Sequence, residues 1–573
     1  MARSIDPSPH RREYPDYATL SRVLRHWAAA HPAHVRLQSL ARTPAGRELW
    51  LITVGPGTTG DGPAVWIDGN MHAAELAGCN AAMAIAETAI RLHTADAADI
   101  PLPAPVLTKA RRVTFHILPR LSPDGAEAVL QSGRVLRSVP RNARRHGDRP
   151  RWHPADIDGD GLALTMRVPD PTGDYVEDEK EPGLMRPREI DDAGPFFRLY
   201  PEGRIEPFDG RTVPQPDFLS DNSPDLNRNF PYDWAPEEDQ HGAGPYPLSE
   251  PQSRAVAEFA QAHPQIFAWL NLHTFGGVFI RPPGAAADTS MDRDDLAMYR
   301  QVETWADALT GYPMVSGYEE FTYEPGRPLH GDLTDFAFHQ QGCLAMVCEL
   351  WDIFARLGVE RQHPFVTHYT RITQDDLRAL ARWDREHNQG RILKPWRAVD
   401  HPQLGDVEVG GWDPRVGLFN PPYEQLPHLC DAIAAFWLRV AALAPCVTID
   451  DLYAAPLGDD LTRITATVRN TGYLSTYGMP SARRLEWNHP LYAHLEAEGP
   501  EPVTTGGSRQ KVGHLHGWGH GRFNPRATLF YPFSPGNTGE RRLSWLVRGH
   551  GDVTIRVTGP RTGTVSASIH ITG

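Results

Sequence analysis

This chain of 573 residues lacks long hydrophobic runs, and no stretch is apolar enough to span a bilayer. Its first residues, Met1 to Tyr17, are polar and rich in proline. No apolar segment follows Arg11 and Arg12, so the sequence predicts no secretory signal peptide. We therefore expect a cytoplasmic protein that has no membrane partner.

Cysteine is scarce and follows no pattern that would build a disulfide framework. The chain has five cysteines, an odd number, and none of them forms a Cys-x-x-Cys pair. We expect a protein of a reducing compartment whose cysteines are buried free thiols. These are Cys79, Cys343, Cys348, Cys430 and Cys446.

An excess of positive charge is also missing, because the formal net charge is −14. A nucleic-acid-binding protein would present a basic face, so we expect no nucleic-acid partner. Hydrophobic residues make up 40% and charged residues 22% of the chain, as in ordinary globular proteins. A length of 573 residues exceeds one ordinary core and predicts two or three domains. The sequence leaves the oligomeric state open.

Strand patterns and helix patterns alternate over much of the chain. Short apolar runs predict strands at Ala64–Ile67, Val113–Leu118, Phe267–Leu272 and Leu344–Cys348. A helical pattern over residues 76–93 separates the first two of these runs. This alternation predicts an α/β fold in which helices flank a sheet.

The pattern changes near residue 446, where short alternating or β-branched runs begin. Predicted strands at Leu461–Val468, Leu543–Val547, Val553–Val557 and Val565–Ile571 indicate an all-β sandwich. A structureless loop of the length of 131–222 is improbable, so this segment is predicted to be an ordered elaboration. The predicted organisation is a tail (1–17), an α/β domain (18–400) with the elaboration (131–222), a linker and helix (401–445), and the sandwich (446–573).

A histidine and a glutamate three residues apart follow one of the predicted strands. His72 and Glu75 follow the run Ala64–Ile67 and precede a helix. Ligands of open α/β sheets bind at the carboxyl ends of strands, where this pair lies. A second pair with the same spacing, His10 and Glu13, has no strand before it. The first pair therefore predicts two metal ligands, and the alternative is a buried histidine bonded to the backbone.

A third ligand is expected at the end of another strand. His273 follows Phe267–Leu272 and meets this requirement. Two histidines and one carboxylate leave the fourth position of zinc open, as in catalytic zinc sites. This ligand set favours Zn²⁺, although Mn²⁺ or Co²⁺ could replace it in vitro. For His273 alone, a strand-end histidine bonded to the backbone is the alternative.

Two further segments concentrate polar side chains. The loop Asp225-Leu-Asn-Arg228 contains a carboxylate, an amide and a guanidinium, although a turn that caps its own backbone would have the same composition. Glu349 follows the apolar run Leu344–Cys348, where burial should raise its pKa toward that of a useful base. An ion-paired carboxylate at a strand end is the alternative for Glu349.

The order of these motifs along residues 15–390 resembles that of the zinc metallocarboxypeptidase family: His72-x-x-Glu75, Asp225-x-Asn-Arg228, His273 and Glu349. The resemblance implies a carboxypeptidase-like mixed sheet and one zinc ion per chain. It also implies that His72, Glu75 and His273 are the zinc ligands and that Asp225 is the carboxylate that orients the first of them. Asn227 and Arg228 would be the pair that holds the terminal carboxylate of the substrate. Glu349 would be the general base.

The resemblance implies three further roles. Arg137 is the best match for the arginine that polarises the scissile carbonyl, and Arg141 is the next. Tyr323 is the nearest match for a mobile tyrosine, with a packing role as the alternative. Thr334, within a predicted helix at 332–341, corresponds to the base of the side-chain pocket. A neutral threonine there predicts a neutral or broad preference for the C-terminal residue.

The resemblance implies a zinc-dependent metallocarboxypeptidase whose partner is a peptide with a free C-terminus. Two alternatives stay open: a zinc amidohydrolase or deacylase that acts on N-acyl amino acids, and a non-catalytic peptide-binding module on the same fold. An assay of free peptides against N-acyl amino acids separates the first two.

A short acidic loop resembles the start of a calcium site. Asp156, Asp158 and Asp160 occupy positions 1, 3 and 5 of such a loop, but Arg167 stands at position 12, where a glutamate is expected. A tight Asp/Gly turn is therefore the prediction, with Ca²⁺ bound by the three aspartates as the alternative.

Overall fold

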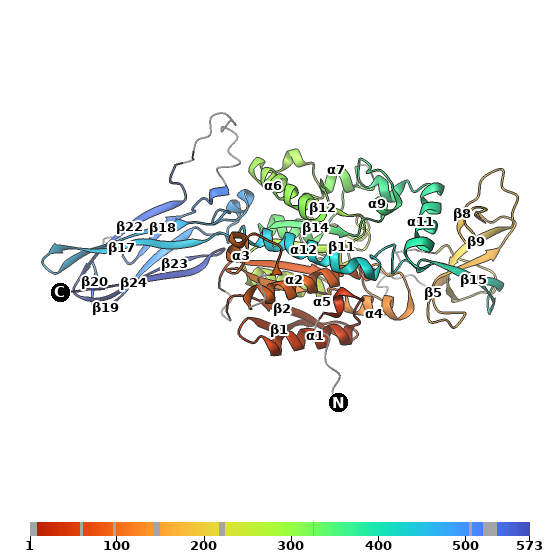
Figure 1. Cartoon of the computed structure of the whole chain (residues 1–573), viewed down its shortest axis with the longest axis horizontal. Coiled ribbons are helices and arrows are strands. Elements are labelled where there is room, and N and C mark those ends of the chain that lie inside the picture. Colours follow the sequence, from red (N-terminus) through yellow and green to blue (C-terminus); the bar gives the residue numbers. More distant parts are fainter. Residues whose placement is uncertain are drawn as a thin grey trace.

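The structure is a computed structural model. It describes residues 8–57, 61–94, 99–140, 149–216, 224–324, 326–503, 507–519, 534 and 536–572. A central α/β body lies between a β-rich body and the C-terminal β sandwich, which is coloured blue in Figure 1. Within these residues, the helices are all too short or too polar to cross a membrane.

In the described part of the chain, eight strands form the central mixed sheet. Their order is β1 (Val35–Arg42), β2 (Glu48–Val54), β4 (Thr114–Leu118), β3 (Ala64–Gly69), β11 (Ile266–Thr274), β14 (Leu344–Leu350), β12 (Val278–Arg281) and β13 (Met314–Ser316). Strands β4, β3, β11 and β14 run parallel, whereas β2 and β12 join this group in antiparallel fashion. The α/β fold with a mixed sheet is thus confirmed.

The parallel strands are buried on both faces. Every residue of β3 and of β11 is buried, which explains why both read as continuous apolar runs in the sequence. In the register of these strands, Leu272 pairs with Gly69 and His273 pairs with Glu349. The carboxyl ends of β3, β11 and β14 therefore meet at one edge of the sheet.

Helix α2 (Ala77–His93) packs closely against this part of the sheet. A Cβ atom on Gly69 would lie 2.3 Å from the carbonyl oxygen of Gly78, and a Cβ atom on Gly78 would lie 2.7 Å from the carbonyl oxygen of Leu272. Both glycines are therefore needed for the close approach of helix and sheet. Other helices of the body are α1 (Tyr17–Ala30), α5 (Pro251–Ala262), α6 (Arg293–Thr310), α11 (Gln374–His387) and α12 (Leu426–Ala441).

A β-rich body extends from the central one (Figure 1). Among the described residues it contains a two-stranded and a six-stranded sheet. They consist of β5 (Arg151–Pro154) with β10 (Gly203–Glu206), and of β15 (Leu393–His401), β16 (Gly405–Trp412), β6 (Thr165–Pro169), β9 (Phe196–Pro201), β7 (Tyr175–Glu177) and β8 (Met185–Pro187). The expected linker at 401–445 therefore needs correction, because β16 belongs to this sheet. Val407 and Val409 alternate along β16 and are buried beside Met166.

The C-terminal strands form two antiparallel sheets, of four strands each within the described residues. One contains β17 (Val447–Gly458), β18 (Leu461–Asn470), β22 (Glu540–Arg548) and β20 (Glu501–Pro502). The other contains β21 (Arg509–Gly513), β19 (Leu491–Glu498), β23 (Gly551–Gly559) and β24 (Gly563–Ile571). Both sheets contribute to one hydrophobic core, as the sandwich prediction requires.

A buried arginine joins the sandwich to the α/β body. Arg561 is 1% exposed, and its guanidinium donates to the carbonyl oxygens of Ile266 and Gln341. The same guanidinium lies 4.8 Å from the ring centre of Trp487. A charge buried in this way is tolerated only because its N–H groups find acceptors.

We predict that Arg561→Ala lowers the melting temperature of the protein, because two buried carbonyl groups lose a charged donor. The free energy of unfolding should fall by about 2 kcal/mol. Differential scanning fluorimetry measures the corresponding change in melting temperature. Arg463→Ala, at an exposed position of β18, is the matched control and should change stability by less than about 0.5 kcal/mol. Equal melting temperatures for the two variants would contradict the proposed contact.

Candidate active site

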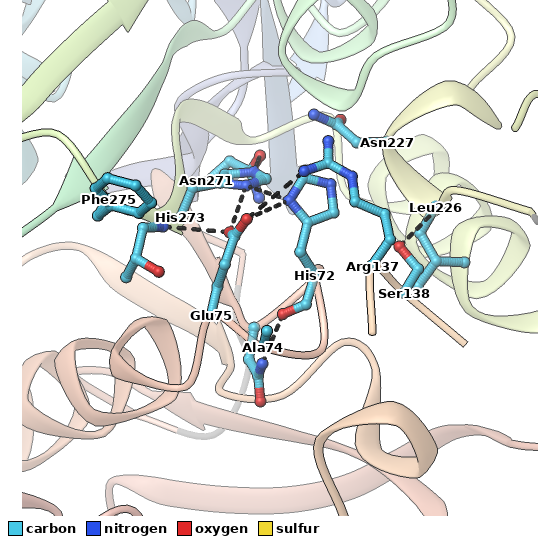
Figure 2. Close-up of polar contacts among 12 residues, drawn as sticks. His72, Ala74, Glu75, Arg137, Ser138, Leu226, Asn227, Asn271, His273 and Phe275 are labelled. Carbon is cyan, nitrogen blue, oxygen red and sulfur yellow. Dashed lines mark hydrogen bonds and ion pairs between the residues drawn. The ribbon is translucent and has the colours of Figure 1, made fainter. Parts of the chain in front are cut away.

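Polar side chains gather at the edge where the parallel strands end. His72 and Glu75 lie in the connection from β3 to α2, His273 lies in β11, and Glu349 lies in β14. Figure 2 shows His72, Glu75 and His273 pointing toward one another, with Arg137 beside them. The parallel register, rather than proximity in the sequence, brings these residues together.

Three donor atoms converge on one point. His72 Nδ1 lies 2.7 Å from Glu75 Oε1, and His273 Nδ1 lies 3.0 Å from both His72 Nδ1 and Glu75 Oε2. Two ring nitrogens that face each other form a hydrogen bond only if one of them is protonated. When neither is protonated, both can direct their lone pairs at one metal cation. Two imidazoles and one carboxylate, all buried, match the ligand set of a catalytic zinc site.

The opposite nitrogen of each imidazole faces an acceptor. His72 Nε2 lies 3.3 Å from Asp225 Oδ1, and His273 Nε2 contacts Asn271 Oδ1. Such partners favour a proton on Nε2 and leave the Nδ1 lone pair directed at the centre of the site. The residues present therefore fit a bound metal ion in donor type and in orientation.

A buried carboxylate beneath the site fixes Asn271. Asp68 accepts hydrogen bonds from Trp66 Nε1 at 2.8 Å, from Trp269 Nε1 at 2.9 Å, and from the amide nitrogen of Asn271. This last bond turns the amide oxygen of Asn271 toward His273. Burial raises the pKa of Asp68 to about 7 in spite of these three bonds. Sequence reasoning missed Asp68 and Asn271, although each is a polar residue that follows a run of apolar residues in its strand.

The carboxylates of the site differ in their electrostatic surroundings. Burial disfavours ionisation of Glu75, but the charges of His72 and His273 outweigh it and hold its pKa below the usual value. Burial raises the pKa of Glu349, and the nearby charge of Glu75 raises it further. Glu349 Oε2 has no hydrogen-bond partner among the described residues. The site thus combines an ionised ligand with a carboxyl group that holds a proton readily.

Asp225, Asn227 and Arg228 form one short turn beside the histidines. Asp225 precedes the 3₁₀ helix η3 (Leu226–Arg228) and accepts a hydrogen bond from Asn227 N. Arg228 is buried, and its Nη1 donates to the carbonyl oxygen of Asn227 at 2.6 Å. No carboxylate of the described residues forms an ion pair with Arg228, so its charge is available to a ligand.

The remaining predicted residues can also be located. Arg137 lies at the site, with Nε 2.9 Å from Asp225 Oδ2 and Nη1 3.8 Å from Glu75 Oε1. Tyr323 is 51% exposed and lies at the wall of the same cavity. Thr334 is buried and lines that cavity. Arg141 lies outside the described residues.

A cavity of about 370 Å³ contains the metal-ligand cluster together with Asn227, Arg228 and Glu349. A larger cavity, of about 1080 Å³, adjoins it and shares Leu136, Phe275 and Phe419 as lining residues. Strands β5 and β9 of the elaboration form one wall of the larger cavity, and α11 contributes to the wall formed by the α/β body. The elaboration therefore borders the approach to the site.

The acidic loop at 156–161 forms a different cluster from the one the sequence indicates. Asp156 and Asp158 gather with Glu202, and the guanidinium of Arg397 lies 3.7 Å from Asp158 and 3.6 Å from Asp160. Asp156 accepts from the backbone N–H groups of residues 159 and 161, and both oxygens of Glu202 accept backbone N–H groups. These contacts describe a tight Asp/Gly turn, and Asp156, Asp158 and Glu202 also form a group that could hold a metal ion.

Comparison with solved structures finds metallocarboxypeptidases at low identity. Bovine thrombin-activatable fibrinolysis inhibitor, in complex with tick carboxypeptidase inhibitor, is 14% identical, with 76% of this chain and 98% of that chain covered and a TM-score of 0.42. Carboxypeptidase A from Helicoverpa armigera is 14% identical over 61% of this chain and 68% of that chain, with a TM-score of 0.39. A metallo-carboxypeptidase from Burkholderia cenocepacia is 14% identical over 73% of this chain and 68% of that chain, with a TM-score of 0.34.

Family models assign both parts of the chain. Residues 446–570 match a domain of unknown function. Residues 20–180 and 211–376 match the family described as zinc carboxypeptidase, and these ranges include His72, Glu75, His273 and Glu349. Since this match spans more than half of the 573 residues, the chain belongs to the zinc carboxypeptidase family.

Proposed function

We propose that this protein is a zinc-dependent carboxypeptidase that hydrolyses the C-terminal bond of peptides with a free carboxylate. The observation that carries the proposal is a pair of features in one cavity. Three metal-ligand atoms converge there, and the buried cation Arg228 has no ion-pair partner among the described residues. A metal site beside a carboxylate-binding cation is what a C-terminal exopeptidase requires.

His72, Glu75 and His273 would hold the zinc ion, because their donor atoms already face one another. When bound, zinc supplies a Lewis acid that polarises the peptide carbonyl and lowers the pKa of a water molecule. Asp225 and Asn271 would keep both imidazoles in the required tautomer and orientation.

Glu349 is proposed as the general base. It faces the cavity from the end of β14, where burial and the charge of Glu75 raise its pKa. A carboxylate of raised pKa accepts a proton from the attacking water and returns it to the departing amine. The lack of a hydrogen-bond partner for Oε2 supports this role, since that oxygen is free to accept a proton.

Cationic groups surround the positions where negative charge would lie. Arg228 and Asn227 would bind the terminal carboxylate, which suits the planar guanidinium fork. Arg137, fixed through Nε by Asp225, would stabilise the charge that develops on the scissile carbonyl oxygen. Tyr323 stands at the mouth of the cavity, where its hydroxyl would contact the substrate backbone.

The large adjoining cavity favours a peptide over a single N-acyl amino acid. Once the C-terminal residue lies beside Arg228, the preceding residues extend past Phe275 and Phe419 into that space. A deacylase of N-acyl amino acids would not need a cavity of about 1080 Å³ there. The elaboration is therefore proposed to contact the amino-terminal side of the substrate.

We predict that Glu349→Gln lowers kcat by about 10³-fold, since a proposed general base is removed while its shape is kept. Zinc content, measured by elemental analysis, should stay near one per chain because Glu349 is not a ligand. Glu360→Gln, at an exposed position, serves as the control and should leave kcat unchanged. Substantial turnover by the Glu349 variant would remove this residue from its proposed role.

We also predict that Arg228→Ala raises KM for peptides with a free C-terminus. The loss of a charged hydrogen-bond pair should reduce kcat/KM by about 10–100-fold. Exposed Arg327→Ala is the matched control. The critical comparison is with C-terminally amidated peptides, whose slower hydrolysis should not change further in the Arg228 variant. An equal loss for both kinds of peptide would show that Arg228 does not bind the carboxylate.

A further inference from the structure

A separate cavity lies at the junction between the α/β body and the sandwich, the two bodies that adjoin each other in Figure 1. Its volume is about 810 Å³, and among the described residues it shares no lining residue with the cavity of the candidate active site. One wall is a face of the central sheet near the edge strand β1, and β19 and β21 of the sandwich contribute the other. A Cβ atom on Gly563 would lie 1.7 Å from the carbonyl oxygen of Asp61, so the two bodies touch at the rim.

The sheet contributes a row of polar side chains to this junction cavity. Arg36 of β1 pairs with Thr53 of β2, and Thr53 pairs with His116 of β4. Side chains of directly paired residues point to the same face of a sheet. His34, two residues before Arg36, shares this face because side chains alternate along a strand. All four residues line the junction cavity, so the row faces the sandwich.

His116 is the buried member of this row and has an unsatisfied ring nitrogen. It is 4% exposed, and its Nδ1 lies 3.0 Å from Thr53 Oγ1. Its Nε2 has no hydrogen-bond partner in the described part of the chain. Burial and the nearby His263 lower the pKa of His116 to about 3, so the ring is neutral. When the Thr53 hydroxyl donates to Nδ1, Nε2 carries the proton and requires an acceptor, which a ligand oxygen would supply.

Two more histidines line the junction cavity and use only one ring nitrogen each. His34 Nδ1 lies 3.1 Å from the carbonyl oxygen of Gly55, and His263 Nδ1 lies 2.7 Å from that of Phe259. A carbonyl oxygen only accepts, so Nδ1 carries the proton in both rings. Within the described ranges, Nε2 of neither ring has a hydrogen-bond partner. A proton gained at Nε2 would turn either ring into a charged donor.

Two arginines of the junction cavity are not neutralised by a carboxylate. Arg36 and Arg509 come from opposite walls, and neither forms an ion pair or donates a side-chain hydrogen bond to the residues that the structure describes. Arg509 lies 3.9 Å from the ring centre of Tyr492, which holds its guanidinium at the sandwich wall. Asp61 is the one acidic residue of the described lining. In a chain with a net charge of −14, two free guanidinium groups in one cavity favour an anionic ligand.

We propose that the junction cavity binds a phosphate dianion, either inorganic phosphate or the phosphate group of a small phosphomonoester. Arg36 and Arg509 would bind its oxygens through their guanidinium forks, and His116 Nε2 would donate to it. A dianion matches the two guanidinium charges, which a single carboxylate does not. These charges repel a metal cation, and the described histidines of the cavity do not form a metal-ligand cluster.

The bound anion would contact both walls and hold the sandwich against the α/β body. The site is independent of the proposed carboxypeptidase function, because the two cavities have different lining residues in the part of the chain that is described.

The test measures the binding of inorganic phosphate to the zinc-loaded full-length protein by isothermal titration calorimetry, with chloride used to keep the ionic strength constant. We expect saturable binding of about one phosphate per chain. Arg36→Ala and Arg509→Ala should each weaken binding by about 10–100-fold, because a charge-assisted hydrogen bond is lost. Both arginines are exposed at the rim, so these variants should fold. Exposed Arg548→Ala, on β22, is the matched control and should bind phosphate as the wild type does.

Arg228→Ala separates the junction cavity from the active site, where a bound phosphate would contact Arg228. Phosphate binding that persists in Arg228→Ala but is weakened in Arg36→Ala and Arg509→Ala supports the proposal. The proposal is overturned if the wild-type protein shows no saturable binding, if all variants bind equally, or if only Arg228→Ala loses binding. Titration with glycerol phosphate distinguishes the two sources of the group, since tighter binding than that of inorganic phosphate supports a phosphomonoester and weaker binding supports the free ion.

Discussion

The parallel pairing of β3, β11 and β14 is the constraint on which the candidate active site depends. This pairing aligns Leu272 with Gly69 and His273 with Glu349, so that His72 and His273, which lie 201 positions apart in the sequence, share one edge of the sheet. A slip of one residue would turn His273 to the opposite face and separate it from the other ligands. The buried, apolar character of these strands makes such a slip costly, because every side chain would exchange its surroundings.

A network of buried polar groups fits into this apolar frame. Asp68 binds Trp66, Trp269 and Asn271, and Asn271 in turn faces His273. Gly69 and Gly78 allow α2 to approach β3, which keeps the connection that carries His72 and Glu75 short. Strand register, helix packing and hydrogen bonding thus act together to direct two imidazoles at one point.

Much of this arrangement could be predicted from the sequence. The central strands were recognisable because buried parallel strands appear as continuous apolar runs. The strand before His72 distinguished that residue from His10, which has the same spacing to a glutamate but packs against Trp27 and Glu87. The α/β fold followed from the alternation of strand and helix patterns, and the family followed from the order of the motifs. The structure collects His72, Glu75, His273 and Glu349 in one cavity.

Other features required three dimensions. β16 lies in a segment rich in proline and glycine, so its pairing with β6 was not visible in the sequence. Asp68 and Asn271 are isolated polar residues whose partners come from other strands. The hydrogen bond from Gly284 N to Asp335 likewise joins residues that lie 51 positions apart in the sequence. Long-range contacts of this kind leave no local pattern.

The central claim is that one divalent metal ion binds where β3 and β11 end. The most direct test is an anomalous-difference map, measured at the zinc absorption edge on crystals of the zinc-loaded protein. We predict one strong peak, within about 2.0–2.2 Å of His72 Nδ1, His273 Nδ1 and a Glu75 carboxylate oxygen. No peak among these residues, or a peak bound only by other side chains, would contradict the account.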